Sequence, residues 1–556
     1  MRGFTGICNT RHFVYMLALF AGVILLPACG GHRLQSDVFH YNEITGIASL
    51  DPAFAKNNSV IWATSQLYNT LIETDAQLQI QPSLAYRWEV DSGGKCYRFY
   101  LRPDVRFHDD PVFPNGEGRN VCASDVVFTW SRLIDPATAS PGAWVLNDRV
   151  ALDRPFRALN DSVVELHLRQ PFAPLLSLLS MNYCAIVAPE AVKQYGASFR
   201  THPVGTGPFR LKRWVEGQAL VLERNPYYFE RDTFGHALPY LSGVSVSFYD
   251  SKITEFLEFQ QGRLDFVNDI ESSFKDELLT PDGTLQASWK DRLQLYKHPY
   301  LNTEYLGILM DSSQAQVRQS PLSNRLIRLA MNYSIDRLKL MRYQRNSIGA
   351  AAVHGFIPNG MPGYSEDTVH RVAGYPYDPA RASRLLAEAG YPGGKGLTTI
   401  KLTTIPVYAD IAQWLVAAWR AAGIPVRVDV VPKSTLLTET ANGSSLFFRG
   451  SWIADYPDAE NYLSVFYSKH PAPPNYTRFT DAAFDQMYED LLAVTSDSLR
   501  RTKIFAMEER LINQAPFIPL WYDEVVHLVQ PTVQGWQPNA LNRLDLRRVK
   551  KRPPAK

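Results

Sequence analysis

The sequence predicts an α/β protein built from more than one lobe. Its 556 residues are enough for more than one hydrophobic core, so two or three lobes are expected. The first third mixes strand-like and helix-like patterns at short spacing, which indicates an α+β or α/β lobe. Residues 424–431 form a strand pattern directly after a helical segment, as a second α/β lobe requires.

The N-terminus predicts export. Arg2 and Arg11 precede an apolar run over 13–26, which is too short for a stable membrane span. The run ends at Leu26-Pro27-Ala28-Cys29, which resembles the bacterial lipobox and so implies cleavage before Cys29 and acylation of its thiol. Residues 29–36 then form a tether. The alternative is an uncleaved anchor helix, and both interpretations attach a soluble body to a membrane surface.

The charge balance argues against a nucleic-acid partner. Removing residues 1–28 takes away two of the 57 lysines and arginines and none of the 55 acidic residues, which leaves a neutral body. Near the other end, the basic, proline-containing segment 547–556 is predicted to be disordered.

The cysteines and the motif content argue against an enzyme. Cys96, Cys122 and Cys184 remain once Cys8 is cleaved off and Cys29 is lipidated, so one disulfide and one spare thiol are possible. Their spacing is not a metal pattern. No His-Glu-x-x-His or Gly-x-Ser-x-Gly motif occurs, and the glycine-rich loop at 390–396 is one residue short of a phosphate loop. We therefore expect no catalytic residues, no metal and no cofactor.

Local patterns place the elements in order. A strand is expected at 38–42, a helix with one apolar face at 59–71, and alternating strands at 97–102 and 163–168. A helix begins at Asp378-Pro379, an acidic N-cap followed by proline, and runs to a glycine stop at 390.

One stretch near the C-terminus carries candidate binding chemistry. The apolar run 446–448 predicts a short buried strand, and Asp455 follows it before Pro457 ends regular structure. A carboxylate so placed can meet a cation that arrives from a cleft. The local alternative is that Asp455 caps a helix beginning near Asp458.

A collinear series of blocks then resembles a known family. Two of these blocks contain Phe99-Tyr100-Leu101-Arg102-Pro103 and Trp452-Ile453-Ala454-Asp455-Tyr456. The series consists of residues 49–52, 81–88, 99–109, 203–209, 222–228, 261–265, 328–337, 377–391, 452–460 and 515–522. From about Tyr41 to Trp536, the chain resembles the family-5 extracellular solute-binding proteins of ABC importers, the oligopeptide- and dipeptide-binding group.

The resemblance implies the type II periplasmic-binding-protein fold: two lobes that close over a ligand, with an extra subdomain in the first. Mapped onto this chain, the parts are a signal peptide (1–28), a tether (29–36), lobe I (37–57, 202–297 and 507–546), its extra subdomain (58–201), lobe II (298–506) and a basic tail (547–556).

It also implies a ligand site made of Asp455, Arg449, Trp452, Tyr300, Tyr41 and Asn42. In this assignment Asp455 holds the ligand's amine, Arg449 helps to receive its carboxylate, and Trp452 and Tyr300 form pocket walls. Tyr41 and Asn42 face the cleft from the first strand. Two positions depart from the family pattern: Lys56 lies where oligopeptide binders often carry an acid, and Ile453 lies where one subgroup has a cysteine.

The implied function is a lipid-anchored, periplasmic or extracytoplasmic monomer that captures oligopeptides or dipeptides and delivers them to an ABC permease and its ATPase. Two alternatives stay open. The same fold could bind a non-peptide solute such as a nickel chelate, haem, a sugar or an opine. It could also serve as a sensor input or a surface adhesin.

Overall fold

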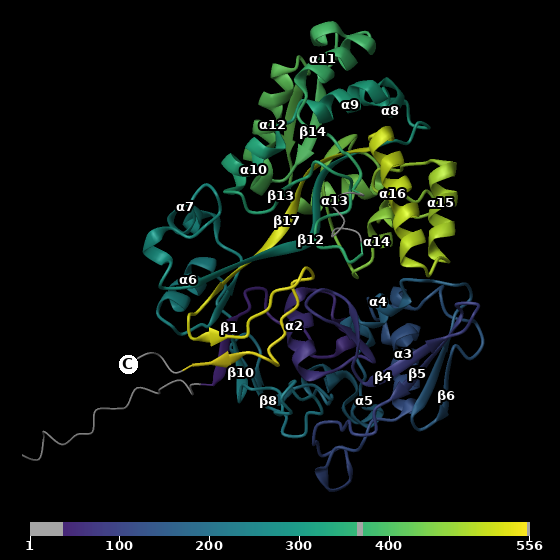
Figure 1. Cartoon of the computed structure of the whole chain (residues 1–556), viewed down its shortest axis with the longest axis vertical. Coiled ribbons are helices and arrows are strands. Elements are labelled where there is room, and N and C mark those ends of the chain that lie inside the picture. Colours follow the sequence, from purple (N-terminus) through teal and green to yellow (C-terminus); the bar gives the residue numbers. More distant parts are fainter. Residues whose placement is uncertain (1–36, 364–370, 553–556) are drawn as a thin grey trace, which may run out of the picture.

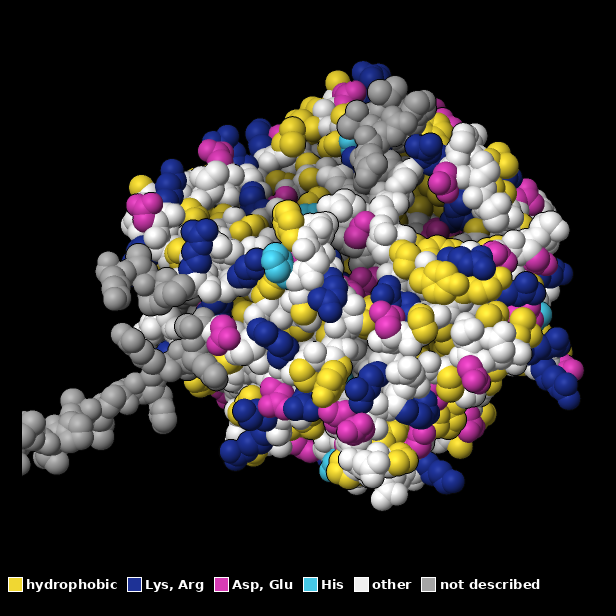
Figure 2. All heavy atoms as spheres, turned by 60° about the horizontal axis from the view of Figure 1, so that its bottom comes forward, with side chains coloured by type: hydrophobic (Ala, Val, Ile, Leu, Met, Phe, Trp, Pro, Cys, Tyr) yellow, Lys and Arg dark blue, Asp and Glu magenta, His cyan; other side chains and the backbone are white. Residues whose placement is uncertain are grey.

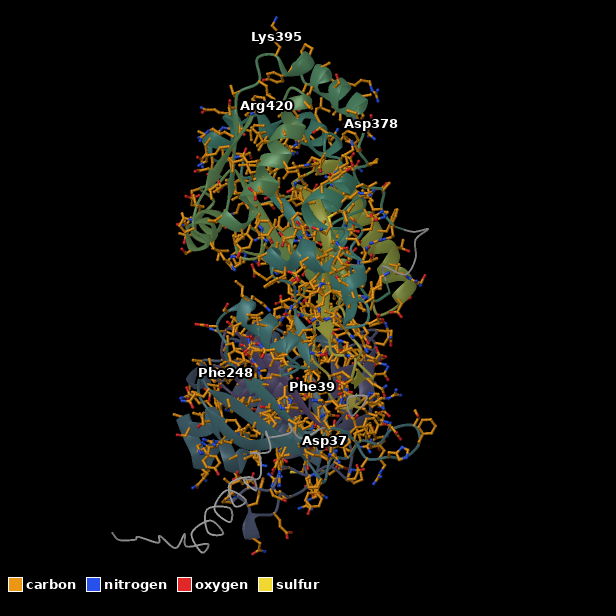
Figure 3. The ribbon with its side chains drawn as sticks, turned by 90° about the vertical axis from the view of Figure 1, so that its left-hand side faces the viewer. Asp37, Phe39, Phe248, Asp378, Lys395 and Arg420 are labelled. Atoms are coloured by element: carbon orange, nitrogen blue, oxygen red, sulfur yellow. The ribbon has the colours of Figure 1, made fainter. Side chains whose placement is uncertain are left out.

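The computed structural model describes residues 37–363 and 371–552. The expected signal peptide, the tether with Cys29, and residues 553–556 of the expected tail lie outside these ranges. Two lobes, one above the other, make up the described part (Figure 1). Figure 3 separates them from the side, with Phe39 and Phe248 in the lower lobe and Asp378, Lys395 and Arg420 in the upper one.

One large sheet runs through both lobes. Its strand order is β15-β14-β16-β12-β17-β11-β1-β10-β9-β8, with β13 beside β17. Two long antiparallel strands, β12 (Gln294–Ile308) and β17 (Phe517–Val529), cross between the lobes. β17 pairs with a first-lobe strand and β12 pairs with a second-lobe strand. The connection between the lobes is therefore a two-stranded ribbon continuous with both halves of the sheet.

The ribbon is irregular where it leaves the first lobe. Pro299 pairs with Glu524 and Thr303 pairs with Tyr522, so β12 carries extra residues between these pairs. Proline has no N–H to give to the ladder, and such bulges redirect the side chains that they contain. Tyr300 lies in this bulge.

In the part of the chain that the structure describes, the first lobe holds the lower part of the sheet and the helices α2, α6 and α7. The elements are β1 (Val38–Asn42), β8 (Phe209–Val215), β9 (Ala219–Arg224), β10 (Gly243–Ser247), β11 (Phe266–Asn268), α2 (Asn58–Leu67), α6 (Lys252–Gln260) and α7 (Lys275–Leu278). α2 begins where the Asn57 side chain accepts a hydrogen bond from the Val60 N–H. A Cβ at Gly205 or Gly207 would lie within 2.4 Å of Leu67 backbone atoms, so this turn needs glycine for close approach to α2.

The extra subdomain contains a second sheet, of order β4-β5-β7-β6. Its elements are β2 (Ile72–Thr74), β3 (Ile80–Pro82), β4 (Ala85–Val90), β5 (Cys96–Leu101), β6 (Phe156–Asn160), β7 (Val163–His167), α3 (Ala123–Ile134), α4 (Leu175–Leu179) and α5 (Pro189–Tyr195). The two predicted alternating strands are β5 and β7. Their inward side chains join one buried cluster that continues into the first lobe, so subdomain and lobe share a core.

The second lobe has its own core. Its elements are β13 (Ala350–Ala351), β14 (Ile400–Thr404), β15 (Val426–Val430), β16 (Phe447–Ile453), α8 (Ala315–Gln319), α9 (Arg325–Tyr333), α10 (Arg337–Arg345), α11 (Pro379–Glu388), α12 (Ala409–Ala421), α13 (Lys433–Asn442), α14 (Glu460–Leu463), α15 (Ala482–Leu492) and α16 (Asp497–Gln514). The expected helix–strand unit is α12–β15, and the Asp378 side chain caps α11 as predicted. α16 contributes to this core, and the boundary expected between 506 and 507 falls within it.

The C-terminal segment departs from its prediction, because residues 547–552 are ordered. β19 (Lys550–Lys551) pairs with β18 (Val533–Gln534). Arg547 forms ion pairs with Glu73 at 2.9 Å and Glu230 at 2.6 Å, and Lys551 pairs with Asp265 at 2.8 Å. Composition suggested a solvated basic tail, but its cations meet acids that folding brings together on the first lobe and its subdomain.

Three further observations bear on the sequence predictions. Cys96, Cys122 and Cys184 are all free thiols. Among the described helices, none has the length and apolar character needed to cross a membrane. Figure 2 shows lysine and arginine side chains interspersed with acidic ones over the face that it displays, which agrees with the even charge balance of the body.

Candidate functional site

A cleft of about 620 Å³ lies between the lobes. Its volume falls in the range of small-ligand sites, about 300–1,000 Å³. From the first lobe and its subdomain, the lining includes Glu43, Thr45, Lys56, Asn57, Asn58, Trp62, Trp144, Asn182, Tyr183, Asn268 and Arg543. From the ribbon and the second lobe come Tyr300, Ile453, Ala454 and Asp455. Both lobes therefore contribute charged groups to one space.

Asp455 occupies this cleft just after β16 ends. Its backbone N–H donates to Asn461 Oδ1 at 3.2 Å, and the Asn461 amide donates to Asp455 Oδ2 at 3.3 Å. The carboxylate is exposed and has no ion-pair partner among the described residues. Burial among the cleft walls raises the pKa of Asp455, and the bond from Asn461 opposes that rise. A carboxylate without an ion-pair partner in the described chain is thus held in place and faces the cleft.

The local alternative for this residue, a helix cap, is not what the structure shows. The side chain of Asp458, not that of Asp455, accepts a hydrogen bond from the Glu460 N–H at the start of α14, at 2.9 Å. Arg500 pairs with the same Asp458 oxygen at 2.6 Å. The N-cap residue of α14 is Ala459, so Asp455 does not cap this helix and its carboxylate stays in the cleft.

Trp452 lies behind the cleft wall rather than on it. The half-buried ring packs against the second-lobe core, and its Nε1–H donates to Asn461 Oδ1 at 3.1 Å. Asn461 is buried and also holds Asp455. The expected pocket-wall tryptophan is thus linked to Asp455 through Asn461, which sequence reasoning missed. Its only sequence signal is that it immediately follows the matched block that ends at Glu460.

Arg449 is committed to the interior of the second lobe. Its Nη2 lies 2.7 and 2.6 Å from the two carboxylate oxygens of Glu304, and its guanidinium stacks 4.1 Å from the Tyr408 ring. Burial raises the pKa of Glu304, and Arg449 acts against that rise. Arg449 does not line the cleft, although its Nε–H is buried without a partner in the described chain.

Tyr300 lines the cleft at the lobe crossing, where the resemblance places it. Burial raises the pKa of Tyr300 to about 12, and the Asp523 carboxylate adds to the rise. Its hydroxyl therefore keeps its proton at neutral pH and can donate a hydrogen bond.

Tyr41 and Asn42 do not face the cleft, contrary to the expectation for the first strand. Tyr41 is 1% exposed and packs edge-on against Trp62, with 6.1 Å between ring centroids. Asn42 is 6% exposed, and its side chain bonds both backbone groups of Tyr249. The reason is that β1 pairs with strands on both sides and lies beneath α2, so Trp62 occupies the cleft wall instead.

Two cations of the first lobe line the cleft. Lys56 is exposed and immediately precedes Asn57, the N-cap of α2, whose first turn also lines the space. Arg543 is half-buried and donates to Thr74 Oγ1 at 3.1 Å. Burial lowers the pKa of Arg543 to about 10, with Glu73 opposing, so the side chain stays charged. The departure at Lys56 was visible in the sequence, whereas Arg543 comes from the opposite end of the chain and carried no signal.

Comparison with known proteins gives three findings. Residues 79–473 match the family model described as bacterial extracellular solute-binding proteins, family 5 Middle. The chain is 28% identical to the probable di/tripeptide-binding protein 5 of Pseudomonas aeruginosa, over 96% of this chain and 97% of that one, and 25% identical to heme-binding protein A of Haemophilus influenzae, over 94% and 96%. The solved structure of HbpA2 from Haemophilus parasuis superposes with a TM-score of 0.79 at 22% identity, covering 93% of this chain and all of that one.

Proposed function

The chain belongs to the bacterial extracellular solute-binding proteins of family 5, and from this membership we propose that it captures short peptides and delivers them to an ABC permease and its ATPase. Members of this family are extracytoplasmic binding proteins and not enzymes. The relatives named as peptide binders make peptides the first ligand class to test.

The observation that carries the proposal is the Asp455 carboxylate. It lies exposed in the cleft, is oriented by Asn461, and has no cation beside it in the described chain. A peptide's terminal ammonium supplies the missing partner. Charge-assisted hydrogen bonds of this kind are shorter and stronger than neutral ones, particularly where water is excluded.

The opposite wall offers a partner for the other end of a peptide. Lys56, Arg543 and the N-terminal turn of α2 all present positive charge or free N–H groups to the cleft. We assign the ligand's carboxylate to this wall. The family resemblance assigns it to Arg449 instead, and the effect of an Arg449 variant on affinity separates the two assignments.

Closure would follow from the ribbon. Because β12 and β17 belong to both halves of the sheet, bending there moves the two walls together. A ligand that bridges Asp455 and the cationic wall favours the closed arrangement through contacts made only in that state. A monomeric state and attachment through a lipid on Cys29 are further parts of this proposal. We also keep the lobe boundaries given above, except where α2 joins the first lobe, where α16 spans the 506/507 boundary, and where residues 547–552 pair with the folded body.

A non-peptide solute is the second candidate. The relative named as a heme-binding protein aligns over almost the full chain. Haem carries two propionate groups, which Lys56 and Arg543 could receive, but it has no ammonium for Asp455.

Native mass spectrometry of the protein purified without denaturation tests the proposal. A mixed set of short peptides retained by the parent, and lost from an Asp455→Ala variant, would support it. A single retained mass that corresponds to haem, a sugar or a metal chelate would overturn the peptide assignment.

A further inference from the structure

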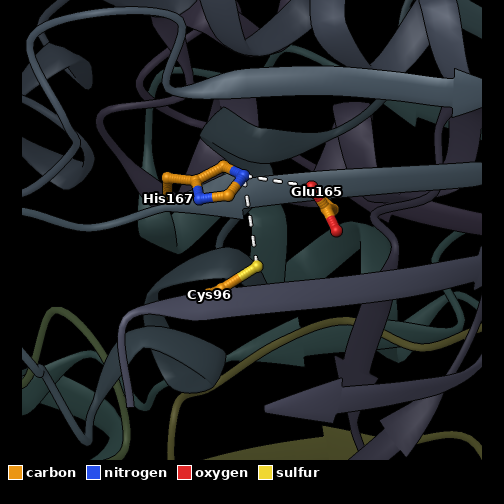
Figure 4. Close-up of side chains that lie close together, drawn as sticks. All are labelled: Cys96, Glu165 and His167. Carbon is orange, nitrogen blue, oxygen red and sulfur yellow. Dashed lines mark hydrogen bonds and ion pairs between the residues drawn. The ribbon is translucent and has the colours of Figure 1, made fainter. Parts of the chain in front are cut away.

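Three side chains of the types that ligate metals lie together on the face of the subdomain sheet opposite its core, away from the cleft. They are Cys96 on β5 and Glu165 and His167 on β7 (Figure 4). The neighbouring residues Tyr97 and Leu166 point inward to the core. Since side chains alternate along a strand, the three polar groups share the opposite side of the sheet, where Glu165 is buried and Cys96 and His167 are half-buried.

The strand register brings these side chains together. Cys96 lies directly opposite His167, and the Leu168 N–H donates to Lys95 O at 2.8 Å. In an antiparallel ladder, hydrogen-bonded pairs alternate with pairs that share no backbone hydrogen bond. Lys95 and Leu168 form a hydrogen-bonded pair, so the next pair, Cys96 and His167, is of the second kind, in which side chains lie closest together. Glu165 is two residues from His167 and so lies on the same face.

The distances suit one metal ion. His167 Nε2 lies 4.0 Å from Cys96 Sγ and 3.1 Å from Glu165 Oε2, and all three ligand atoms lie within 4.8 Å of one another. Zinc bonds of about 2.0–2.3 Å in tetrahedral geometry place two ligand atoms about 3.5 Å apart. Only small side-chain adjustments separate the observed arrangement from a coordinating one.

A neighbouring arginine orients the carboxylate. Arg98 donates to Glu165 Oε1 from Nη2 at 2.7 Å and from Nε at 3.0 Å. This leaves Oε2 directed at the imidazole. Metal-ligating carboxylates are commonly held in this way by a partner that does not touch the metal.

We propose that Cys96, Glu165 and His167 form a binding site for one zinc-class divalent transition metal, with a fourth position open to water. A thiolate, an imidazole and a carboxylate together suit zinc better than magnesium or calcium, which prefer oxygen ligands. Binding breaks the S–H bond of Cys96 and releases its proton to solvent as the metal–sulfur bond forms. The cysteine spacing could not predict this site, because two of its ligands are not cysteines and lie far along the chain.

The Cys96 thiol must lose its proton before it can coordinate a metal. Burial, together with the Glu165 and Asp91 carboxylates, raises the pKa of the Cys96 thiol. Because binding releases that proton, metal affinity should strengthen as pH rises.

The test is a zinc titration of the reduced full-length protein in competition with a chromophoric chelator. We expect one equivalent to bind and the affinity to fall at least tenfold in Cys96→Ser and in His167→Ala. Cys122→Ser and Cys184→Ser are matched controls that should bind as the parent does. Absence of one-equivalent binding in the parent, or equal loss in the control variants, would overturn the proposal.

Cobalt provides a spectroscopic test of whether the Cys96 thiolate coordinates the metal directly. Cobalt bound to the parent should show thiolate-to-metal charge-transfer absorbance, which Cys96→Ser removes and Cys184→Ser keeps. Circular dichroism checks that each variant is folded. Survival of the band in Cys96→Ser would place the metal elsewhere. None of the three ligands lines the cleft, so these variants should retain peptides as the parent does. The metal-site proposal can therefore fail without affecting the transport proposal, and the reverse also holds.

Discussion

Two carboxylates near the same strand pair of the second lobe have opposite circumstances. Glu304, on β12, is 2% exposed and is held by both oxygens to Arg449. Asp455, just past β16, is exposed in the cleft and has only Asn461 as a hydrogen-bond partner for its carboxylate among the described residues. Burial raises the pKa of both. Arg449 neutralises the Glu304 carboxylate within the fold. The Asp455 carboxylate has no such cation in the described chain, so a cation from outside would have to neutralise it.

The difference separates stability from binding. A buried pair that loses one member leaves the other uncompensated in a low-dielectric interior, which costs folding free energy. An exposed carboxylate without an ion-pair partner contributes little to the free energy of folding. It gains a charge–charge interaction when a cation binds beside it. Arg449 and Asp455, which the family resemblance links to the ligand, should therefore respond differently to mutation. A change at Arg449 should lower the stability of the fold, and a change at Asp455 should weaken ligand binding.

The largest expected effect is on stability. Arg449→Ala should lower the free energy of unfolding by about 3 kcal/mol, because it strands the buried Glu304 carboxylate. Chemical denaturation measures the loss, and adding Glu304→Gln to Arg449→Ala should recover part of it. Calorimetry should find peptide affinity little changed. Normal stability with collapsed affinity would instead assign Arg449 to the ligand.

Acid should weaken binding. Only the ionised form of Asp455 attracts an ammonium, and its pKa lies above the ordinary aspartate value. As pH falls through that raised pKa the carboxylate takes up a proton, so affinity should drop about tenfold per pH unit below it, while the peptide amine stays charged. Calorimetry between about pH 7 and pH 4 follows the change. A curve of the same shape in Asp455→Asn would mean that another group titrates.

A smaller effect is expected from the residue that orients Asp455. Asn461→Ala removes one hydrogen bond to the carboxylate and one to its backbone N–H, and should weaken peptide binding by about 1 kcal/mol. Trp452→Phe keeps an aromatic ring and loses only the bond to Asn461, so it should cost less. A larger loss in Trp452→Phe than in Asn461→Ala would show that the ring itself contacts the ligand.

The smallest expected effect is at the cationic wall. Lys56 is exposed, so Lys56→Gln should reduce affinity for a peptide with a free C-terminus by only about 0.5 kcal/mol. The same peptide with an amidated C-terminus is the control and should bind both proteins equally. An equal loss for the amidated peptide would remove the carboxylate from this wall.

Much of the scaffold could be predicted because its signals are local. The alternation over 97–102 and 163–168 appears as β5 and β7, and the Asp378 cap starts α11. Lys56 was set apart by its departure from the family pattern. The disorder predicted for 547–552 was wrong because its cations pair with acids such as Glu73 and Asp265, whose proximity only the fold creates.

The site was harder to predict because its residues meet through tertiary structure. Tyr41 was expected at the cleft, but Trp62 from α2 covers it. Arg543 reaches the cleft beside Lys56 from the other end of the chain. Asn461 matters through two hydrogen bonds that only the turn after β16 allows. In each case the position of the residue depends on burial or on a contact between segments far apart in the sequence. Neither produces a periodic pattern in the sequence.

The central claim is that Asp455 binds a ligand's ammonium group, and a double-mutant cycle tests it most directly. Calorimetry would compare a free-amine peptide and its N-acetylated form against the parent and Asp455→Asn. Because the raised pKa of Asp455 costs the ligand-free protein stability at neutral pH, Asp455→Asn should unfold at no lower temperature than the parent. We predict that either change alone weakens binding by about 2 kcal/mol or more, and that acetylation adds nothing once the carboxylate is gone. Full affinity in Asp455→Asn, or equal effects of acetylation in both proteins, would contradict the account.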